Sequence, residues 1–172
     1  MLTALELDVS NSIVFDRQDI LVTVEGIQDV YILKAMLEIT KNESKFNKIK
    51  FIPGIGASKI PYLYSYLYGM GYNVYALFDN DKAGRDAIDG IVQGDQDDER
   101  VNKLFKYDLD KTSESDFLLE DLFSNNDRKE YLKTKSTILY KRIYDNRKNI
   151  KFEEETIKNF KEFFKNLLAK LK

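Results

Sequence analysis

The sequence predicts an α/β fold in which a four-stranded, mainly parallel sheet is flanked by helices and followed by a helical extension. Through about the first hundred residues, short runs rich in β-branched and aromatic residues alternate with segments whose apolar residues recur at helical spacing. This alternation is typical of βαβ units, which build parallel sheets. Beyond residue 111 only helical patterns appear, and we therefore expect the extension at the C-terminal end.

Four segments have the composition expected of strands. Residues 20–25, 48–52 and 72–78 are short apolar runs, and residues 101–109 alternate between apolar and polar side chains. The second run stops at Pro53 and Gly54.

Helical patterns connect and follow these strands. We expect helices at residues 28–40, 58–69, 83–92, 114–123, 127–144 and 153–171, with residues 94–99 as a solvated acidic turn. The last helix carries an apolar stripe from Ile157 to Leu171. That stripe must be buried, either on the protein's own sheet or on a partner's surface.

The composition excludes several kinds of chemistry. Among the 172 residues there is no cysteine and no histidine, so disulfides, thiolate sites and the commonest general base are absent. Catalysis would have to use carboxylates, lysines, tyrosines or bound metal. The first ten residues do not resemble a signal peptide, and no stretch approaches the roughly 20 apolar residues of a membrane span. We expect a cytoplasmic protein.

The charges are distributed unevenly along the chain. Residues 1–98 contain 9 basic and 15 acidic side chains, whereas residues 99–172 contain 18 basic and 14 acidic ones. The basic excess lies in one segment and consists of Arg128, Lys129, Lys133, Lys135, Lys141, Arg142, Arg147, Lys148 and Lys151. This segment is either a surface that docks the phosphates of a nucleic acid or a solvated helix face.

Carboxylates follow two of the predicted strands directly. Glu25 ends the first strand before Gly26, Asp29 follows in the first helical turn, and the third strand is followed by Asp79, Asn80 and Asp81. The carboxyl ends of parallel strands line one crevice, so these side chains are expected to converge. Carboxylates brought together repel each other unless hard cations lie between them, and oxygen ligands suit Mg²⁺ or Mn²⁺.

Each of these acids also has a purely structural interpretation. Asp29 is placed where an acidic side chain favours a helix N-terminus, and the Asp79 motif resembles a turn that caps the next helix. Glu25 has the weakest structural explanation, because a glutamate before glycine at a strand end stabilises little.

Two further motifs are candidates for the same site. The loop of Gly54, Gly56 and Lys59 lies between a strand and a helix, where its N–H groups could hold a phosphate or anchor the acidic crevice. In the sequence Leu-Leu-Glu-Asp-Leu, Glu120 or Asp121 could reach the crevice as a ligand of a second metal ion, or face solvent.

Taken in order, Val-Glu-Gly-x-x-Asp, the glycine loop and Phe-Asp-Asn-Asp-Lys-Ala-Gly resemble the TOPRIM domain. This domain is shared by topoisomerases, bacterial primases, small ribosomal-RNA maturases and OLD-family (overcoming lysogenization defect) nucleases. The later Leu-Glu-Asp-Leu motif is most similar to the OLD branch. The resemblance implies a Rossmann-like catalytic domain over residues 18–125, with residues 126–172 as a basic, amphipathic helical extension.

The resemblance also implies roles for individual residues. Metal ligands would be Glu25, Asp29, Asp79, Asp81 and either Glu120 or Asp121, holding Mg²⁺ or Mn²⁺, with two ions expected. A lysine that stabilises the transition state would be Lys133 or Lys135, with Lys141 in reserve. Lys141 and Arg142, with the glycine loop, would contact nucleic acid. The implied activity is metal-dependent endonucleolytic cleavage of DNA.

OLD proteins normally carry an ABC-type ATPase ahead of this domain, and the chain contains no phosphate-binding ATPase loop. We therefore expect either a domain from a longer protein or one that works with a separate ATPase subunit, and a homo-oligomer is one option. Two alternatives to a DNA nuclease remain. One is a ribosomal-RNA maturase of similar size, and the other is a non-catalytic module that binds metal or phosphate to regulate a partner.

Overall fold

The computed structural model describes residues 15–94, 98–109, 115–133 and 136–171. Its centre is a four-stranded sheet of order β2-β1-β3-β4. The strands are β1 (Ile20–Val24), β2 (Ile49–Pro53), β3 (Asn73–Phe78) and β4 (Leu104–Lys106). Every pair of neighbouring strands is parallel. The predicted α/β class with a four-stranded sheet is therefore confirmed.

The register brings the ends of the two central strands together. Ile20 of β1 pairs with Asn73 of β3, and the pairing continues to Thr23 and Ala76. Both strands therefore end at the same edge of the sheet, β1 just before Glu25 and β3 just before Asp79. This is the edge at which open α/β sheets place their ligands.

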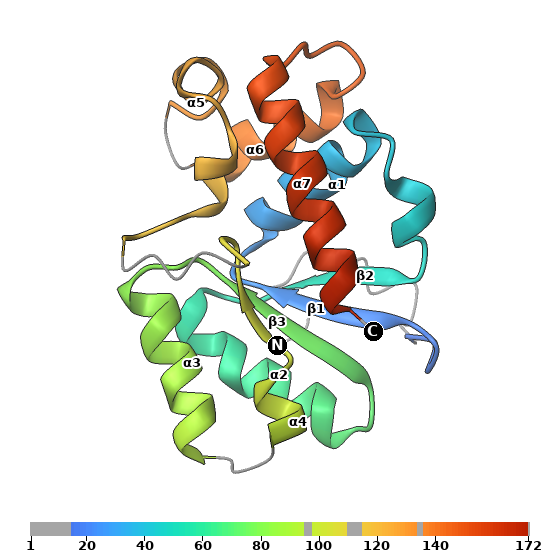
Figure 1. Ribbon diagram of the computed structural model, residues 1–172, viewed down its shortest axis with the longest axis vertical. Coiled ribbons are helices and arrows are strands. Elements are labelled where there is room, and N and C mark those ends of the chain that lie inside the picture. The colour runs from blue at the N-terminus through green and yellow to red at the C-terminus, as the bar shows by residue number, and fades with distance from the viewer. Residues whose placement is uncertain (1–14, 95–97, 110–114, 134–135, 172) are drawn as a thin grey trace.

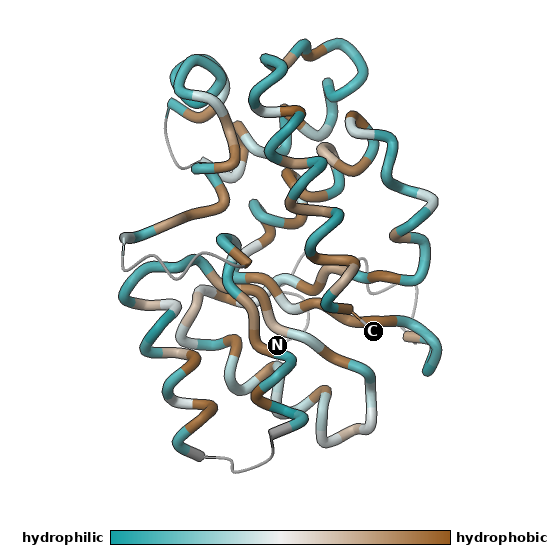
Figure 2. The backbone as a smooth tube through the Cα atoms, viewed as in Figure 1, coloured by the Kyte–Doolittle hydropathy of each residue, from teal (hydrophilic) through white to brown (hydrophobic). Residues whose placement is uncertain are grey.

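Helices cover both faces of the sheet (Figure 1). One face packs against α1 (Ile27–Ile39), α6 (Thr137–Asn146) and α7 (Glu154–Lys170), and the other against α2 (Ile60–Gly69) and α3 (Lys82–Gly94). Apolar segments concentrate along the sheet and on the sides of helices that face it (Figure 2). Burial of these two apolar layers is the main force that holds the fold together.

The C-terminal helix packs on the protein's own core. Phe160, Phe164 and Leu167 of α7 have no exposed surface, and the ring of Phe164 meets that of Phe46 edge-on at 5.3 Å between centroids. Helix α6 lies along α1 (Figure 1), where Arg147 forms an ion pair with Glu38. The apolar stripe of the last helix is therefore buried on the protein's own core and not on a partner's surface.

The predicted helix over residues 114–123 is wrong. Residues 110–114 lie outside the described part of the chain, and within residues 115–123 the only helical turn is the 3-10 helix η4 (Leu119–Leu122). Before it, Phe117 is extended and pairs antiparallel with Asn80. Its N–H and carbonyl both bond to the Asn80 backbone, at 2.9 and 2.8 Å. This pairing at the sheet edge overrides the helical spacing of the leucines.

Two other predicted elements are shorter than expected. The pattern over residues 127–144 is not one helix but two, α5 (Asn125–Tyr131) and α6, and residues 134–135 between them lie outside the description. In place of a strand over 101–109, the chain forms the short helix α4 (Asp98–Val101) and then the three-residue β4. The hydroxyl-rich sequence before α6 disfavours a continuous helix.

Two short 3-10 helices complete the fold, η2 (Glu43–Phe46) and η3 (Ala57–Lys59). Helix α5 is joined to the start of α7 by buried polar groups, since Thr156 donates to Asp127 at 2.5 Å and accepts from the Ser124 N–H at 2.8 Å. The division into domains at residue 125 stays a prediction. None of the helices in the described ranges is both long and apolar enough to cross a membrane.

Candidate metal centre

Glu25 lies at the tip of β1, where the glycine loop holds its backbone. The N–H of Gly54 donates to the Val24 carbonyl at 2.7 Å, and that of Gly56 donates to the Glu25 carbonyl at 2.9 Å. Gly56 has φ +84°, a conformation that favours glycine. These two N–H groups therefore bond to the end of β1 and hold the backbone of Glu25, and a contact of the glycine loop with phosphate stays a prediction.

The side chain of Glu25 reaches the neighbouring strand. Its Oε1 accepts the backbone N–H of Asp79 at 3.2 Å. The tips of β1 and β3 are thus joined by a bond between a carboxylate and the peptide that carries the second carboxylate. Charge-assisted bonds of this kind fix an acidic side chain more firmly than neutral ones do.

Asp79 is fixed from two other directions. Its Oδ1 accepts the N–H of Leu119 at 2.9 Å, and its carbonyl lies against Gly84 in the first turns of α3. A Cβ on Gly84 would stand 2.0 Å from that carbonyl oxygen. Only glycine lets α3 approach the end of β3 so closely.

Asp29 faces the same region from the first turn of α1. Its Oδ2 accepts the N–H of Gly26 at 3.3 Å, as in a capping box. The helix-start function considered for this residue is therefore present in the structure. It does not exclude a second function, because Asp29 is also electrostatically coupled to other carboxylates at this edge.

Glu120 and Asp121 take different directions from η4. Glu120 raises the pKa of both Asp29 and Asp79 through the repulsion between their charges. Asp121 instead forms an ion pair with Arg128 and accepts the N–H of Leu118 at 2.7 Å. The structure thus brings Glu120 to the acidic edge and uses Asp121 to hold η4 against α5.

These placements define an acidic cluster of four side chains, Glu25, Asp29, Asp79 and Glu120. Burial, together with the negative charge of Glu25, raises the pKa of Asp79 to about 8 and that of Asp29 to about 7. Groups whose pKa is raised this far, in a cleft and by a specific charged neighbour, are typical of functional sites.

The middle of the Asp-Asn-Asp motif holds the edge together. Asn80 is 1 % exposed, and its amide donates to Asp108 at 2.8 Å. Arg85 donates to the Asn80 side-chain oxygen at 3.2 Å and to Asp116 at 3.0 Å. The second acid of the motif, Asp81, accepts the N–H of Gly84 at 2.8 Å, which is the helix-capping arrangement considered for it.

Comparison with protein families gives one match in this part of the chain. Residues 18–81 match the family model described as overcoming lysogenization defect protein-like, TOPRIM domain. This segment is similar to OLD-like TOPRIM domains. It contains β1 to β3 and three members of the acidic cluster, Glu25, Asp29 and Asp79, whereas Glu120 lies outside the match. No curated protein and no solved structure matches the chain. TOPRIM domains are generally nuclease or primase domains that need a divalent metal.

Two tyrosines border the acidic cluster and were not expected from the sequence. The hydroxyl of Tyr140, from α6, donates to Glu120 at 2.6 Å. Tyr107, just after β4, is 2 % exposed, and burial, followed by the charges of the cluster, raises its pKa well above the usual value. In sequence both look like core aromatics, and no spacing rule relates them to Glu25 or Asp79.

The basic residues lie around the TOPRIM domain and partly outside the description. Lys135 lies outside the described residues, whereas Lys133, Lys141 and Arg142 are exposed, as is Lys59 beside the Tyr62 ring. Thr137, which opens α6, accepts a bond from Gln28 of α1 at 3.1 Å. The start of α6 therefore lies beside the first turn of α1, next to the cluster.

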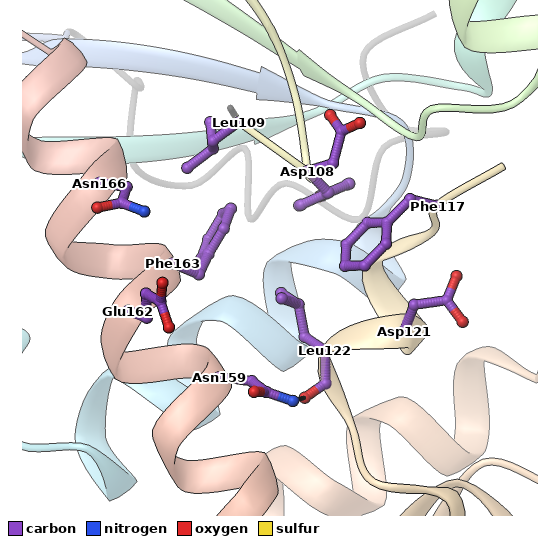
Figure 3. Close-up of a pocket in the computed structure, with 10 residues that line it drawn as sticks. Asp108, Leu109, Phe117, Asp121, Leu122, Asn159, Glu162, Phe163 and Asn166 are labelled. Atoms are coloured by element: carbon purple, nitrogen blue, oxygen red, sulfur yellow. Dashed lines mark hydrogen bonds between the residues drawn. The ribbon is translucent and has the colours of Figure 1, made fainter. Parts of the chain in front are cut away.

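A cavity of about 140 Å³ lies near this edge, between η4, α7 and the segment after β4 (Figure 3). Tyr107, Asp121 and Phe163 are among its lining residues. In Figure 3 the amide of Asn159 bonds to the carbonyl of Leu122, at 3.2 Å. Asp121 lines this cavity and Glu120 does not, so the cavity lies beside the acidic cluster and is not the cluster itself.

The donor set of the acidic cluster fits a hard divalent cation. All four members of the cluster offer carboxylate oxygens, the ligand type of Mg²⁺ and Mn²⁺. Within the described ranges, no three acidic side chains already stand close enough to enclose an ion. The cluster is an open set of donors whose mutual repulsion a cation would relieve.

Proposed function

We propose that this chain is a divalent-metal-dependent endonuclease that hydrolyses phosphodiester bonds of DNA. One observation carries the proposal. Four carboxylates from separate segments converge at the edge of an OLD-like TOPRIM sheet, and two of them have pKa values raised to about 7 and about 8. A protein without histidine or cysteine has few other means of hydrolysing a phosphodiester.

In this proposal the acidic cluster holds Mg²⁺ or Mn²⁺, with two ions expected and Asp81 as a further candidate ligand. Bound cations would supply an activated water and charge stabilisation at the scissile phosphate. The chain's own groups orient the ligands: the N–H of Leu119 holds Asp79, and the hydroxyl of Tyr140 holds Glu120. Hydrogen bonds to the ligands themselves fix ligand geometry in metal sites.

A lysine from the segment between α5 and α6 is proposed to stabilise charge on the phosphate. Lys133 and Lys135 remain the candidates, and support comes from the bond between Gln28 and Thr137, because that segment ends beside the cluster. Positive charge aimed at a developing oxyanion lowers the barrier to hydrolysis.

Nucleic acid would approach over the extension. Lys141 and Arg142 are exposed on α6, whereas Arg128 and Arg147 are already paired with Asp121 and Glu38. Control by an ABC-type ATPase domain or subunit is part of the proposal and rests on the family match.

Plasmid nicking tests the proposal. Supercoiled DNA is incubated with the wild-type chain and Mg²⁺ or Mn²⁺, alongside Glu25→Gln, Asp79→Asn and, as a matched control, Asp89→Asn. Asp89 is an exposed acid of α3 outside the cluster. We expect the nicking rate of both cluster variants to fall roughly a hundredfold or more, since loss of a group that only hydrogen-bonds to a metal ligand already costs ten- to hundredfold. The control should cleave like wild type.

Each alternative function predicts a different result when cleavage of structured RNA and binding of Mn²⁺ are measured on the same proteins. Cleavage of structured RNA in preference to DNA would favour the maturase-type activity. Binding of Mn²⁺ without cleavage of either substrate would favour the regulatory module. Nicking that survives in both cluster variants would refute the metal centre altogether.

A further inference from the structure

Tyr107 follows β4 at the edge of the sheet where Asp79 follows β3. The last pair of the parallel β3/β4 ladder is Phe78 with Lys106, and the N–H of Tyr107 donates to the Phe78 carbonyl at 3.0 Å. Extending this register by one residue beyond both strands places Asp79 opposite Tyr107. Neighbouring residues of adjacent parallel strands point to the same face of a sheet. That face is the one covered by α1 and α7, because Tyr107 belongs to their core.

The hydroxyl of Tyr107 is buried and has no hydrogen-bond partner in the described part of the chain. Two other buried tyrosines have one: Tyr64 donates to the Arg100 carbonyl at 2.8 Å and Tyr140 donates to Glu120. An unsatisfied buried hydroxyl is rare and destabilising, because the group has lost water and gained nothing in exchange. Phenylalanine at this position would fill nearly the same space without that penalty.

We propose that Tyr107 is a positioning residue of the metal centre, whose hydroxyl donates a hydrogen bond to the carboxylate of Asp79 when a cation holds that carboxylate in place. The inference rests on the proposed metal-dependent function. A tyrosine hydroxyl is protonated at neutral pH and can therefore donate this bond. The free-energy cost of the unsatisfied Tyr107 hydroxyl in the metal-free protein would then be offset when metal binds.

A water molecule is the competing explanation. Tyr107 lines the cavity of Figure 3, whose volume of about 140 Å³ has room for water. If a permanent water bonded the hydroxyl, Tyr107 would be a structural residue and the hydroxyl would stabilise the protein with or without metal. The two explanations therefore predict opposite changes in the stability of the metal-free Tyr107→Phe variant.

The experiment measures thermal unfolding in a chelator and calorimetric binding of Mn²⁺, on the full chain. We expect Tyr107→Phe to unfold in chelator at the same temperature as wild type or about 2–4 °C higher, and to bind Mn²⁺ roughly ten- to hundredfold more weakly. The matched control is Tyr64→Phe, on the opposite face of the sheet. It should unfold at a lower temperature and bind Mn²⁺ like wild type.

Three results would overturn the inference. Unchanged Mn²⁺ affinity in Tyr107→Phe refutes the positioning role while leaving the metal centre intact. Weaker binding together with a lower unfolding temperature in chelator assigns Tyr107 a structural role instead. If wild type itself binds no Mn²⁺, this inference and the proposed function fail together. The Mn²⁺ affinity of wild type therefore distinguishes failure of the inference alone from failure of both.

Discussion

The carboxylate of Asp79 accepts the backbone N–H of Leu119 at 2.9 Å. This bond joins the end of β3 to a segment 40 residues further along the chain. It brings the residue after Leu119, Glu120, to the same edge of the sheet as Glu25 and Asp29. The acidic cluster therefore depends on an irregular segment as well as on the two strand tips.

Gly84 tests how tightly the end of β3 is packed. In Gly84→Ala the added Cβ would stand 2.0 Å from the Asp79 carbonyl oxygen, so α3 or Asp79 must move. We expect the free energy of unfolding to fall by about 1–3 kcal/mol and Mn²⁺ binding to weaken. Gly90→Ala in the same helix is the control, because its Cβ meets open space and should stabilise by about 0.5–1 kcal/mol. Urea unfolding measures both, and equal effects would contradict the packing described.

The raised pKa values predict how stability depends on pH. Asp79 and Asp29 have pKa values of about 8 and about 7 in the folded protein, against the ordinary value of 3.8 for an aspartate side chain. Between these values the folded state binds more protons than the unfolded state, so the free energy of unfolding falls as pH rises from about 4 to about 8. The stability that the two protonated carboxyl groups contribute is fully present below pH 4 and is lost as pH rises through their folded-state pKa values. Urea unfolding in chelator measures it.

Two comparisons check the origin of that slope. Asp79→Asn should flatten the profile, since the neutral amide does not titrate, and saturating Mn²⁺ should restore stability at pH 8 by offsetting the repulsion. If the stability of the metal-free protein instead rises between pH 5 and pH 8, these carboxylates are not buried beside other negative charges as described.

Glu120 and Asp121 are neighbours with different expected functions. Glu120→Gln keeps the shape of the side chain but removes a charge from the cluster, and we expect Mn²⁺ affinity to fall at least about tenfold. Asp121→Asn weakens a partly exposed ion pair with Arg128, and should cost about 1 kcal/mol or less of stability with little change in Mn²⁺ affinity. Calorimetry on both variants decides the assignment, and the reverse pattern would exchange the two functions.

Asn80 is expected to matter for folding. Asn80→Ala would leave the buried carboxylate of Asp108 without its amide donor, at a cost of about 1–3 kcal/mol in the free energy of unfolding. Asn126→Ala is the control, because Asn126 is exposed and bonds only at the surface, to Glu153 at 2.8 Å. Its effect should stay within about 0.5 kcal/mol. A small effect at Asn80 would mean that water replaces the lost amide.

The parallel sheet could be predicted from the sequence because its strands are continuous apolar runs. Leu21, Val22 and Val24 are all fully buried, as expected of a strand covered on both faces. The segment around Phe117 could not be predicted in this way. Its leucines have helical spacing, and only the pairing with Asn80, 37 residues earlier in the sequence, makes it extended. Local patterns do not carry such contacts.

The site was predictable only in part, for a related reason. Glu25 and Asp79 stand directly after strands, so the topology alone brings them together. Tyr107 and Tyr140 come from a strand end and a helix far along the chain, and a buried aromatic residue has the same pattern whether or not its hydroxyl serves a function. The choice between Glu120 and Asp121 needed the direction of each side chain.

Calorimetric titration of Mn²⁺ at pH 8 tests the central claim most directly, using wild type, Glu25→Gln, Asp79→Asn and the Asp89→Asn control. It reports on the acidic cluster without requiring a substrate or an ATPase. We predict that wild type and the control bind Mn²⁺ alike and that both cluster variants lose binding. Equal Mn²⁺ binding by all four proteins, or none by wild type, would contradict a metal centre at this edge of the sheet.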